Sequence, residues 1–243
     1  MAGFLAPLND ELRLTEVLGA DLAAHVQCRV NPRARRVSLR VDVAGKAVIL
    51  VRPRRAASAF VARFVAEKRG WIAAQVAAFP PEIPFGDGHV VSLLGTDLTL
   101  RLAPGARSGV WREGQILFVS GRAEHARRRV RDWLKNEARR NLSAMAHEFA
   151  ARLERTVRRI TIRDPRSRWG SCSRDGTLSL SWRLVLAPEN VARYVVAHEV
   201  AHLKHMNHSA VFWRTVDGLV DDAATARAWL RRHGAALHGF GGI

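Results

Sequence analysis

The segment from Pro188 to about Met206 constrains the fold of this chain more than any other stretch. Proline is well placed as the first residue of a helix, and the residues after it are mostly helix formers. Most of them are also apolar, which predicts a buried helix. Yet the segment contains His198-Glu199-Val200-Ala201-His202. Buried histidine and glutamate side chains need partners, so the fold must supply polar or ionic groups here.

The two histidines of this H-E-x-x-H motif are four residues apart, so they project from one helix face about one turn apart. Their ring nitrogens can meet at one metal ion, and neutral imidazole is a good ligand for Zn²⁺. Glu199 is offset in angle from both and can reach a zinc-bound water without displacing it. Zinc lowers the pKa of that water toward 7, so the carboxylate can act as its general base. The motif therefore predicts a zinc-dependent hydrolase.

A third metal ligand is needed, and the sequence offers two histidines. His205 lies on the same helix face as the pair, but three ligands in line along a straight helix cannot converge on one ion. His208 has the third-ligand spacing of H-E-x-x-H-x-x-G-x-x-H, although His205 replaces the glycine that bends the chain. Asn207 can substitute for it, because asparagine tolerates the left-handed conformation that ends helices. His208 is therefore the favoured ligand, with Asp217, Asp221 and Asp222 as outside candidates.

The region that follows the metal helix is predicted to begin a second helix. Ser209 is a good capping residue, and the helix is expected over residues 210–220.

The N-terminal half of the chain has the pattern of β-strands. Apolar residues alternate from Val37 to Val51 around a turn, which predicts a hairpin with one buried face. A helix is predicted over 57–79, a second strand–turn–strand over 90–102, and a short strand over 115–119.

The pattern changes near Gly121, where a segment without glycine or proline begins. One long helix or two are predicted from Arg122 to about Arg155, and short strands over 159–163 and 177–186. The chain is therefore expected to be α+β, with a β-rich N-terminal region over 1–121 and a catalytic domain over 122–243.

The charge of the chain is strongly positive, with 39 Lys and Arg against 22 Asp and Glu, or +17. The arginines gather in three clusters, at 29–36, 52–55 and 127–131. Such a surface attracts polyanions, so nucleic acid is a candidate partner. The clusters are not interleaved with aromatic residues that could stack on bases. An ordinary solvated surface without a nucleic-acid partner is therefore the alternative interpretation.

The remaining features predict a cytoplasmic protein that does not enter a membrane. No apolar stretch is long enough to span a bilayer, and the first thirty residues lack the pattern of a signal peptide. A secreted domain stapled by disulfides would carry more than Cys28 and Cys172, so both are predicted to be free thiols.

Several of these motifs together resemble a known family. His198 to Leu203, Asn207-His208-Ser209 and Phe212-Trp213 form one block, and Arg168 to Ser173 followed by Leu178 to Leu184 forms another. Both are similar to the YgjP-like metallopeptidases, a zincin group related to the SprT-like proteins. Weaker matches extend the resemblance over nearly the whole chain. It implies a zincin-like catalytic domain, zinc ligands at His198, His202 and His208, a catalytic Glu199 and a peptide or protein substrate.

The block around Trp169 also allows a physical interpretation. In zincin-like folds a sheet edge lies beside the metal helix, where an extended substrate can pair with it. Residues 169–173 are candidates for that edge; the alternative is a packing role, with Trp169 as a core anchor and Gly170 as a tight bend. Cys172 is a weak candidate nucleophile, because nothing in the sequence predicts a depressed pKa. Tyr194 suits either a core position or a role in stabilising an oxyanion.

The predicted function is zinc-dependent hydrolysis of peptide or other amide bonds. One rival is a nucleic-acid-binding module with a structural zinc, but such sites are normally closed by four ligands and rich in cysteine. A second rival combines the two, as a protease that acts on DNA-bound proteins.

Overall fold

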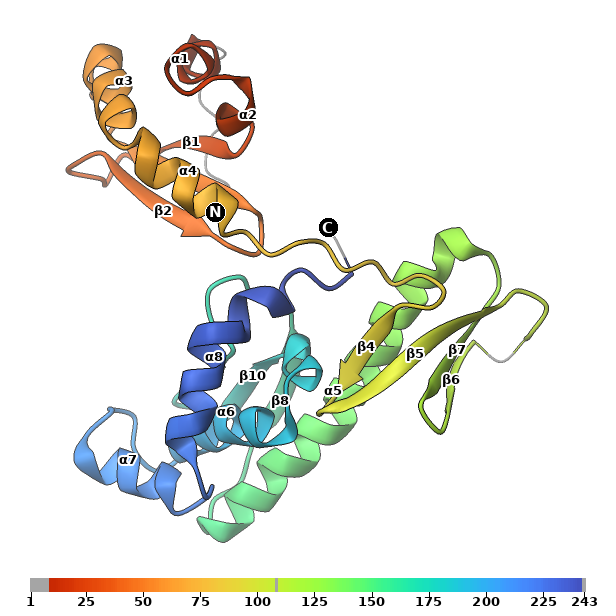
Figure 1. The fold of residues 1–243 in the computed structure, drawn as a ribbon. Helices are drawn as coiled ribbons and strands as arrows, with labels where there is room; N and C mark the ends of the chain where they lie inside the picture. The colour runs from red at the N-terminus through yellow and green to blue at the C-terminus, as the bar shows by residue number, and fades with distance from the viewer. Residues whose placement is uncertain (1–8, 108, 242–243) are drawn as a thin grey trace. The chain divides into compact units, whose positions relative to one another are not determined.

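The computed structural model describes residues 9–107 and 109–241 (Figure 1). They form two compact units, the first ending at Pro81 and the second beginning at Glu82. The boundary predicted at Gly121 lies inside the second unit, where strands give way to a long helix. The predicted α+β fold is confirmed, with strands concentrated before Gly121 and helices after it. Within the described residues, no helix combines the length and apolar character needed to cross a membrane.

The first unit is built on a three-stranded sheet of order β1–β3–β2. Strands β2 (Ser38–Asp42) and β3 (Ala47–Arg52) form the predicted antiparallel hairpin, while β1 (Val26–Val30) pairs with β3 in parallel. Its described residues also form the helices α1 (Asn9–Leu18), α2 (Ala20–Ala23), α3 (Ser58–Glu67) and α4 (Arg69–Ala77). The helix predicted over 57–79 is therefore two helices, because Lys68 leaves the helical conformation between them.

The second unit contains two sheets. The first has the order β4–β5–β7–β6, formed by β4 (Val90–Leu93), β5 (Thr96–Ala103), β6 (Val110–Glu113) and β7 (Ile116–Ser120). Its β4–β5 hairpin turns at Leu94 and Gly95, whose φ angles of 50° and 87° are those of a tight two-residue hairpin turn. The second sheet has the order β8–β10–β9, formed by β8 (Arg159–Arg163), β9 (Gly170–Cys172) and β10 (Thr177–Ser181). Strand β9 therefore lies at an edge of its sheet.

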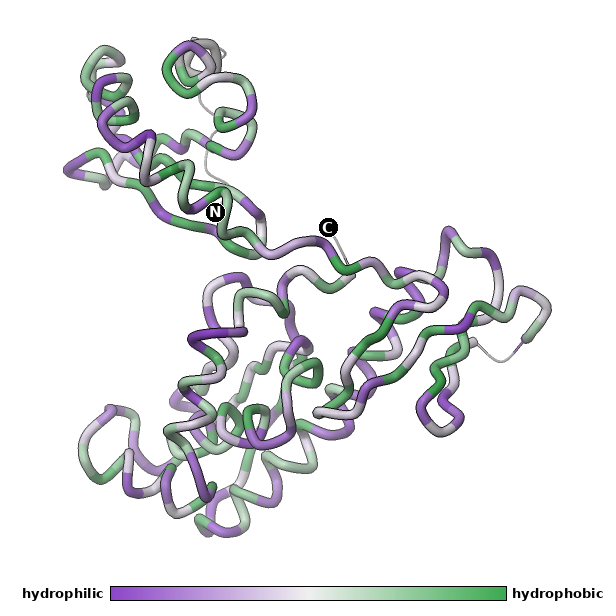
Figure 2. The backbone as a smooth tube through the Cα atoms, viewed as in Figure 1, coloured by the Kyte–Doolittle hydropathy of each residue, from purple (hydrophilic) through white to green (hydrophobic). Residues whose placement is uncertain are grey.

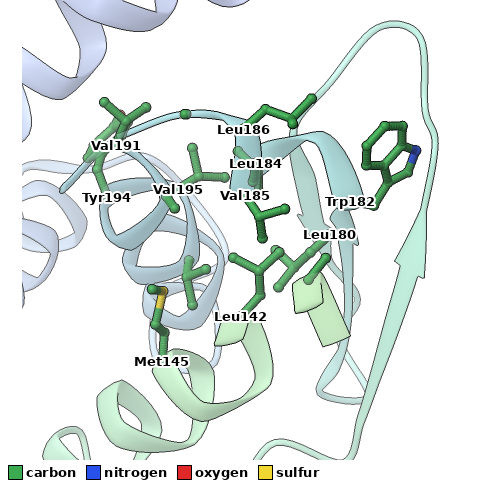
Figure 3. Close-up of a cluster of buried hydrophobic side chains, with 14 of the residues drawn as sticks. Leu142, Met145, Leu180, Trp182, Leu184, Val185, Leu186, Val191, Tyr194 and Val195 are labelled. Atoms are coloured by element: carbon green, nitrogen blue, oxygen red, sulfur yellow. The ribbon is translucent and has the colours of Figure 1, made fainter. Parts of the chain in front are cut away.

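The core of the second unit surrounds helix α5 (Ala126–Arg152), which confirms the long helix predicted there. Hydrophobic and hydrophilic residues alternate along its tube (Figure 2), and the buried ones recur at helical spacing. Leu142 and Met145 of α5 join Leu180 and Val185 in a buried hydrophobic cluster (Figure 3). Such close packing fixes the elements that carry the site.

The strand predicted over 177–186 ends at Ser181. The chain continues as a short 3₁₀ helix, Trp182–Leu186, in which every residue is buried. The Ser181 hydroxyl accepts a hydrogen bond from the Arg183 amide at 3.3 Å and so caps this helix. A continuous apolar run cannot by itself distinguish a buried strand from a buried helix, which explains the difference.

Arg183 is a buried polar connection, only 8% exposed. Its guanidinium donates to both carboxylate oxygens of Asp164, at 2.8 and 3.2 Å. It also donates to the carbonyls of Leu237 and Phe240, at 2.8 and 3.1 Å. Arg183 thus joins the loop before β9 to the end of helix α8 (Ala223–Leu237).

Candidate metal centre

Helix α6 (Glu189–Ala201) holds the predicted H-E-x-x-H motif on a buried element. Pro188 stands at its N-cap position, and the helix packs against α5 and α8. Val196, Ala197 and Val200 are fully buried, and Figure 3 shows Val191 and Val195 in the same core. The last turn of α6, which carries His198 and Glu199, is therefore held in place by close packing.

The chain turns immediately after this helix, earlier than predicted. Helix α6 ends at Ala201 instead of continuing to Met206, because the amides of Leu203 and Lys204 form short-range bonds to Val200 and Ala201. The prediction of a left-handed Asn207 is wrong: among the described non-glycine residues, only Lys46, Leu94 and Glu154 have positive φ. Instead, hydrogen bonds between residues three apart replace the helical bonds between residues four apart, and the chain turns there.

This turn brings His198, His202 and His208 together, with one ring nitrogen of each within 4.8 Å of the others. The Nε2 atoms of His198 and His208 are 3.1 Å apart. The centroids of the His202 and His208 rings are separated by 4.9 Å, and those of His198 and His202 by 5.2 Å. Residues ten positions apart in sequence thus converge on one point.

Neighbouring groups fix the orientation of these rings. His202 Nδ1 lies 3.0 Å from the carbonyl oxygen of His205, so it donates there and leaves Nε2 with a free lone pair. Phe212, on helix α7 (Ala210–Asp217), is fully buried beneath the cluster. Its ring centroid lies 4.9, 4.7 and 4.7 Å from those of His198, His202 and His208. Ser209 occupies the N-cap position of α7, but its side chain makes no capping bond.

The donor set fits a divalent metal. Two nitrogens bound to a tetrahedral zinc at 2.0–2.1 Å are about 3.3–3.4 Å apart. The separation of 3.1 Å between the Nε2 atoms of His198 and His208 is close to this value. Moreover, His198 Nδ1 is buried without a hydrogen-bond partner in the described part of the chain. A buried polar atom without a partner lowers stability, and such atoms are often found at functional sites. Three neutral imidazoles would leave one coordination position open.

Two of the three histidines, His198 and His202, are held toward the neutral form that binds metal. Burial lowers the pKa of His198 to about 4, and positive charge on His202, His208 and Arg227 acts in the same direction. Burial also lowers the pKa of His202, although its hydrogen bond to the His205 carbonyl opposes the effect. Because the metal competes with protons for the ring nitrogens, low pKa values favour metal binding at neutral pH.

Glu199 lies beside this cluster and is only 7% exposed. Burial raises its pKa to about 7, while the charge of Arg168 partly offsets that rise. Its side chain lies directly against Gly170 of β9: a Cβ on Gly170 would be 2.6 Å from Glu199 Cγ and 2.8 Å from Oε1. Gly170 has no positive φ, so it serves this close approach and not a tight bend.

A cleft of about 370 Å³ opens at Glu199. Helix α6 contributes Tyr194, Val195, His198 and Glu199 to its lining. The chain entering β9 contributes Arg168, Trp169 and Gly170, and helix α8 contributes Arg227, Leu230 and Arg231. One metal-site histidine, the buried glutamate and an edge strand thus share a single opening to solvent.

The other candidate ligands do not join the cluster. His205 takes part only through its carbonyl oxygen, and its own Nε2 is buried without a partner in the described part of the chain. Among the residues that the structure describes, Asp217, Asp221 and Asp222 lie outside the three-histidine group. Asp222 instead caps α8, accepting a hydrogen bond from the Thr225 amide at 2.9 Å.

The structure also bears on the two remaining candidates near the motif. Burial, with the negative charges of Glu199 and Asp175, raises the pKa of Cys172 to about 11, so its thiol is a poor nucleophile. In the described part of the chain, Cys172 and Cys28 are not joined by a disulfide. Tyr194 is 6% exposed and also lines the cleft, with its ring centroid 6.2 Å from that of His198. It therefore occupies the core and the cleft wall at once.

Two sets of residues at the site were not assigned from sequence. The sequence predicts no function for Phe212 beyond its place in the family-like block, and none for Arg227 and Arg231. The two arginines are four residues apart and flank Leu230, so a helical face was visible. The sequence could not show that this face would lie against α6.

Comparisons with known proteins place these observations in a family. None of the curated proteins matches the chain. Among solved structures, the metallopeptidase zymogen of Pyrococcus abyssi abylysin matches with 23% identity and a TM-score of 0.34, over 38% of this chain and 92% of that one. The family model of the YgjP-like metallopeptidase domain matches residues 35–233, most of the length of the chain. The chain therefore belongs to the YgjP-like family and carries its metallopeptidase domain.

Proposed function

We propose that this protein is a zinc-dependent peptidase in which His198, His202 and His208 hold the metal and Glu199 is the general base. The observation that carries the proposal is the convergence of three imidazoles next to Glu199, a buried carboxylate that lines a cleft together with His198. The cluster contains three histidines and no cysteine, which favours a catalytic site over a structural one.

When bound, zinc would polarise the scissile carbonyl and lower the pKa of a coordinated water toward 7. Glu199 accepts a proton from the attacking water and then gives it to the departing amine. Its burial suits the second step, because burial favours the protonated carboxyl group that donates to the amine. Tyr194, which lines the same cleft, is the proposed donor of a hydrogen bond to the developing oxyanion.

Strand β9 is the proposed docking edge for the substrate. It pairs with β10 on one side only, as judged from the strands of the described residues. An extended peptide can add to such an edge through backbone hydrogen bonds. Gly170 would keep that peptide close to Glu199, because no side chain separates the two residues.

The test is cleavage of a labelled general protein substrate, such as casein. We expect activity in the zinc-loaded protein, its loss on chelation and its return with added zinc. Glu199→Gln should lower kcat by about 10²–10⁴-fold. Glu189→Gln, at the exposed start of the same helix, is the matched control and should remain active. Activity that survives chelation or Glu199→Gln would contradict the proposal.

A second candidate function, nucleic-acid binding, is favoured by one observation in the first unit. Strand pairing places Val30 opposite Arg52 and Ser38 opposite Val51, so two arginine clusters meet at one end of the sheet. Within the described residues, exposed guanidinium groups there have no hydrogen bond or ion pair: Arg33, Arg35, Arg36, Arg54 and Arg55. This end of the sheet could bind a phosphate backbone. It would suit a peptidase whose substrates are bound to nucleic acid.

The third arginine cluster is used differently. Arg127 donates to the carbonyl of Gly241, Arg129 to the hydroxyl of Ser120, and Arg128 pairs with Asp132. We therefore expect Arg35→Glu with Arg54→Glu to abolish salt-dependent binding to a DNA duplex, measured by fluorescence anisotropy. Arg128→Glu should have little effect. Absent or salt-insensitive binding by the wild type would exclude this second function.

The two free cysteines also suit a reducing compartment, which fits a protein of the cytoplasm.

A further inference from the structure

The cleft beside Glu199 is strongly basic. Three arginines, Arg168, Arg227 and Arg231, line it, whereas Glu199 is the one acidic residue in its lining. A cleft lined mainly by charges of one sign concentrates ligands of the opposite sign.

Glu199 is the nearest counter-charge, and its interaction with Arg168 acts without a direct contact. In the part of the chain that the structure describes, none of the three cleft arginines forms a hydrogen bond or ion pair, although other arginines of the same unit do. Arg193 binds the carboxylate of Glu148 with contacts of 2.5 and 3.1 Å, and Arg158 binds that of Asp175 at 2.8 Å. The guanidinium groups of the cleft therefore keep their donors available for a ligand.

The positions of the arginines relate them to the reacting centre. Arg227 lies over the ring of Trp213 at 5.1 Å, and Trp213 stacks on His208 with a centroid distance of 5.7 Å. Arg227 is thus held beside the metal cluster. Arg231 follows one turn later on α8, and Arg168 precedes the edge strand β9. A peptide lying along β9 would have arginines from two different elements within reach.

We propose that the cleft selects peptides that carry a carboxylate close to the scissile bond, bound by Arg227 and Arg231 with support from Arg168. This inference rests on the proposed peptidase function of the same cleft. A guanidinium group binds a carboxylate with two parallel hydrogen bonds, which gives both affinity and orientation. The carboxylate can belong to an internal Asp or Glu or to the free C-terminus of the peptide.

The substrates for the test are matched fluorescence-quenched peptides. One series has blocked termini and differs only by Glu, Gln or Lys at each position around the cleavage site. A second series has Gln throughout and either a free or an amidated C-terminus. We expect kcat/KM to be at least about tenfold higher with the carboxylate than with its amide, and to fall as salt rises. The series with the larger effect identifies the source of the carboxylate.

Variants assign the effect to the cleft. Arg227→Gln with Arg231→Gln should reduce the tenfold preference to about twofold or less, and Arg231→Glu should shift it toward Lys peptides. Arg232→Glu is the matched control, because Arg232 is exposed on the same helix and lies outside the cleft lining. It should keep the preference of the wild type. Equal kcat/KM for carboxylate and amide peptides would overturn the inference, as would unchanged selectivity in the double variant.

A binding measurement separates this inference from the proposed function. The same peptides, labelled with a fluorophore, are titrated into Glu199→Gln protein with and without the arginine substitutions, and anisotropy is recorded. Tighter binding of carboxylate peptides that depends on Arg227 and Arg231 supports the inference without any turnover. Such binding without hydrolysis by the wild type would contradict the peptidase function alone. Loss of oligonucleotide binding in the arginine variants, with no change for peptides, would contradict the inference and indicate a nucleic-acid site.

Discussion

Glu199 and Gly170 show how closely single residues are matched at this site. The side chain of Glu199 fills the space in which a Cβ at position 170 would lie. Any residue larger than glycine must therefore displace either the carboxylate or the edge strand. The position of the Glu199 carboxylate, the proposed general base, is thus set partly from outside its own helix.

Substitution of Gly170 by alanine tests this contact. The added methyl would lie 2.6 Å from Glu199 Cγ, so the carboxylate must move. We expect kcat to fall by about tenfold or more, since small displacements of a catalytic group are costly. Zinc content should stay at the wild-type level, because the three histidines are untouched. Overpacking should cost about 1–3 kcal/mol of stability, measurable by urea denaturation. Unchanged kcat would show that Glu199 tolerates the methyl.

The pKa values of His198 and Glu199 predict opposite effects of pH on the stability of the metal-free protein. The folded-state pKa of His198, about 4, is below its unfolded value, so the unfolded state binds the extra proton and stability falls as pH drops from 6.5 to 4. The folded-state pKa of Glu199, about 7, is above its unfolded value, so stability rises as pH drops from 7 to 4.5. In the wild type the two effects largely cancel.

Single variants should separate the two effects. Relative to wild type, Glu199→Gln should lose about 1–3 kcal/mol between pH 7 and 4.5, whereas His198→Gln should gain a similar amount. Urea denaturation of chelator-treated protein across this range measures both. Parallel pH profiles for the three proteins would contradict the assigned pKa directions.

At the scale of elements, the cleft is bounded by α6, α8 and β9, and Arg183 fixes two of these relative to each other. Its guanidinium binds Asp164, in the loop before β9, and the carbonyls of Leu237, the last residue of α8, and Phe240. Burial alone would raise the pKa of Asp164, but the hydrogen bonds and charge of Arg183 outweigh it and hold that pKa below its usual value.

Replacing Arg183 by methionine should destabilise the second unit by about 3 kcal/mol, because it leaves the Asp164 carboxylate and two carbonyls without their partner. The loss of stability should be measured by urea denaturation. Arg183→Lys should recover only part of it, since an ammonium group cannot reproduce the paired hydrogen bonds. A change below about 0.5 kcal/mol in Arg183→Met would mean that solvent replaces the lost contacts.

Most elements that lie in strongly periodic segments could be predicted from sequence, including the β2–β3 and β4–β5 hairpins and α5. The sequence was less informative where tertiary contacts decide the backbone. Residues 182–186 form a buried 3₁₀ helix instead of a strand, and α6 ends at Ala201 because local hydrogen bonds tighten there. The spacing of His208 predicts that it approaches the motif. The predicted cause, a left-handed Asn207, is wrong, because the chain turns through short-range hydrogen bonds to Val200 and Ala201.

At the scale of the molecule, the change in composition along the chain coincides with a change in secondary structure and not with the limit of a compact unit. The change near Gly121 marks the start of a long helix, whereas tertiary contacts divide the chain after Pro81. The family model covers residues 35–233 and so includes parts of both units, although the histidine cluster and the cleft lie in the second. Likewise the net charge of +17 indicated polyanions, but only the structure distinguishes arginines with internal partners from those that line the cleft.

The most direct test of the whole account is the metal content of the purified protein, measured by elemental analysis on wild type, His208→Ala and Glu199→Gln in parallel. We expect about one equivalent of zinc in the wild type and in Glu199→Gln, and much less in His208→Ala, because the ligands and the general base are different residues. Wild-type protein that binds no metal even when zinc is supplied, or His208→Ala that retains a full equivalent, would contradict the three-histidine centre.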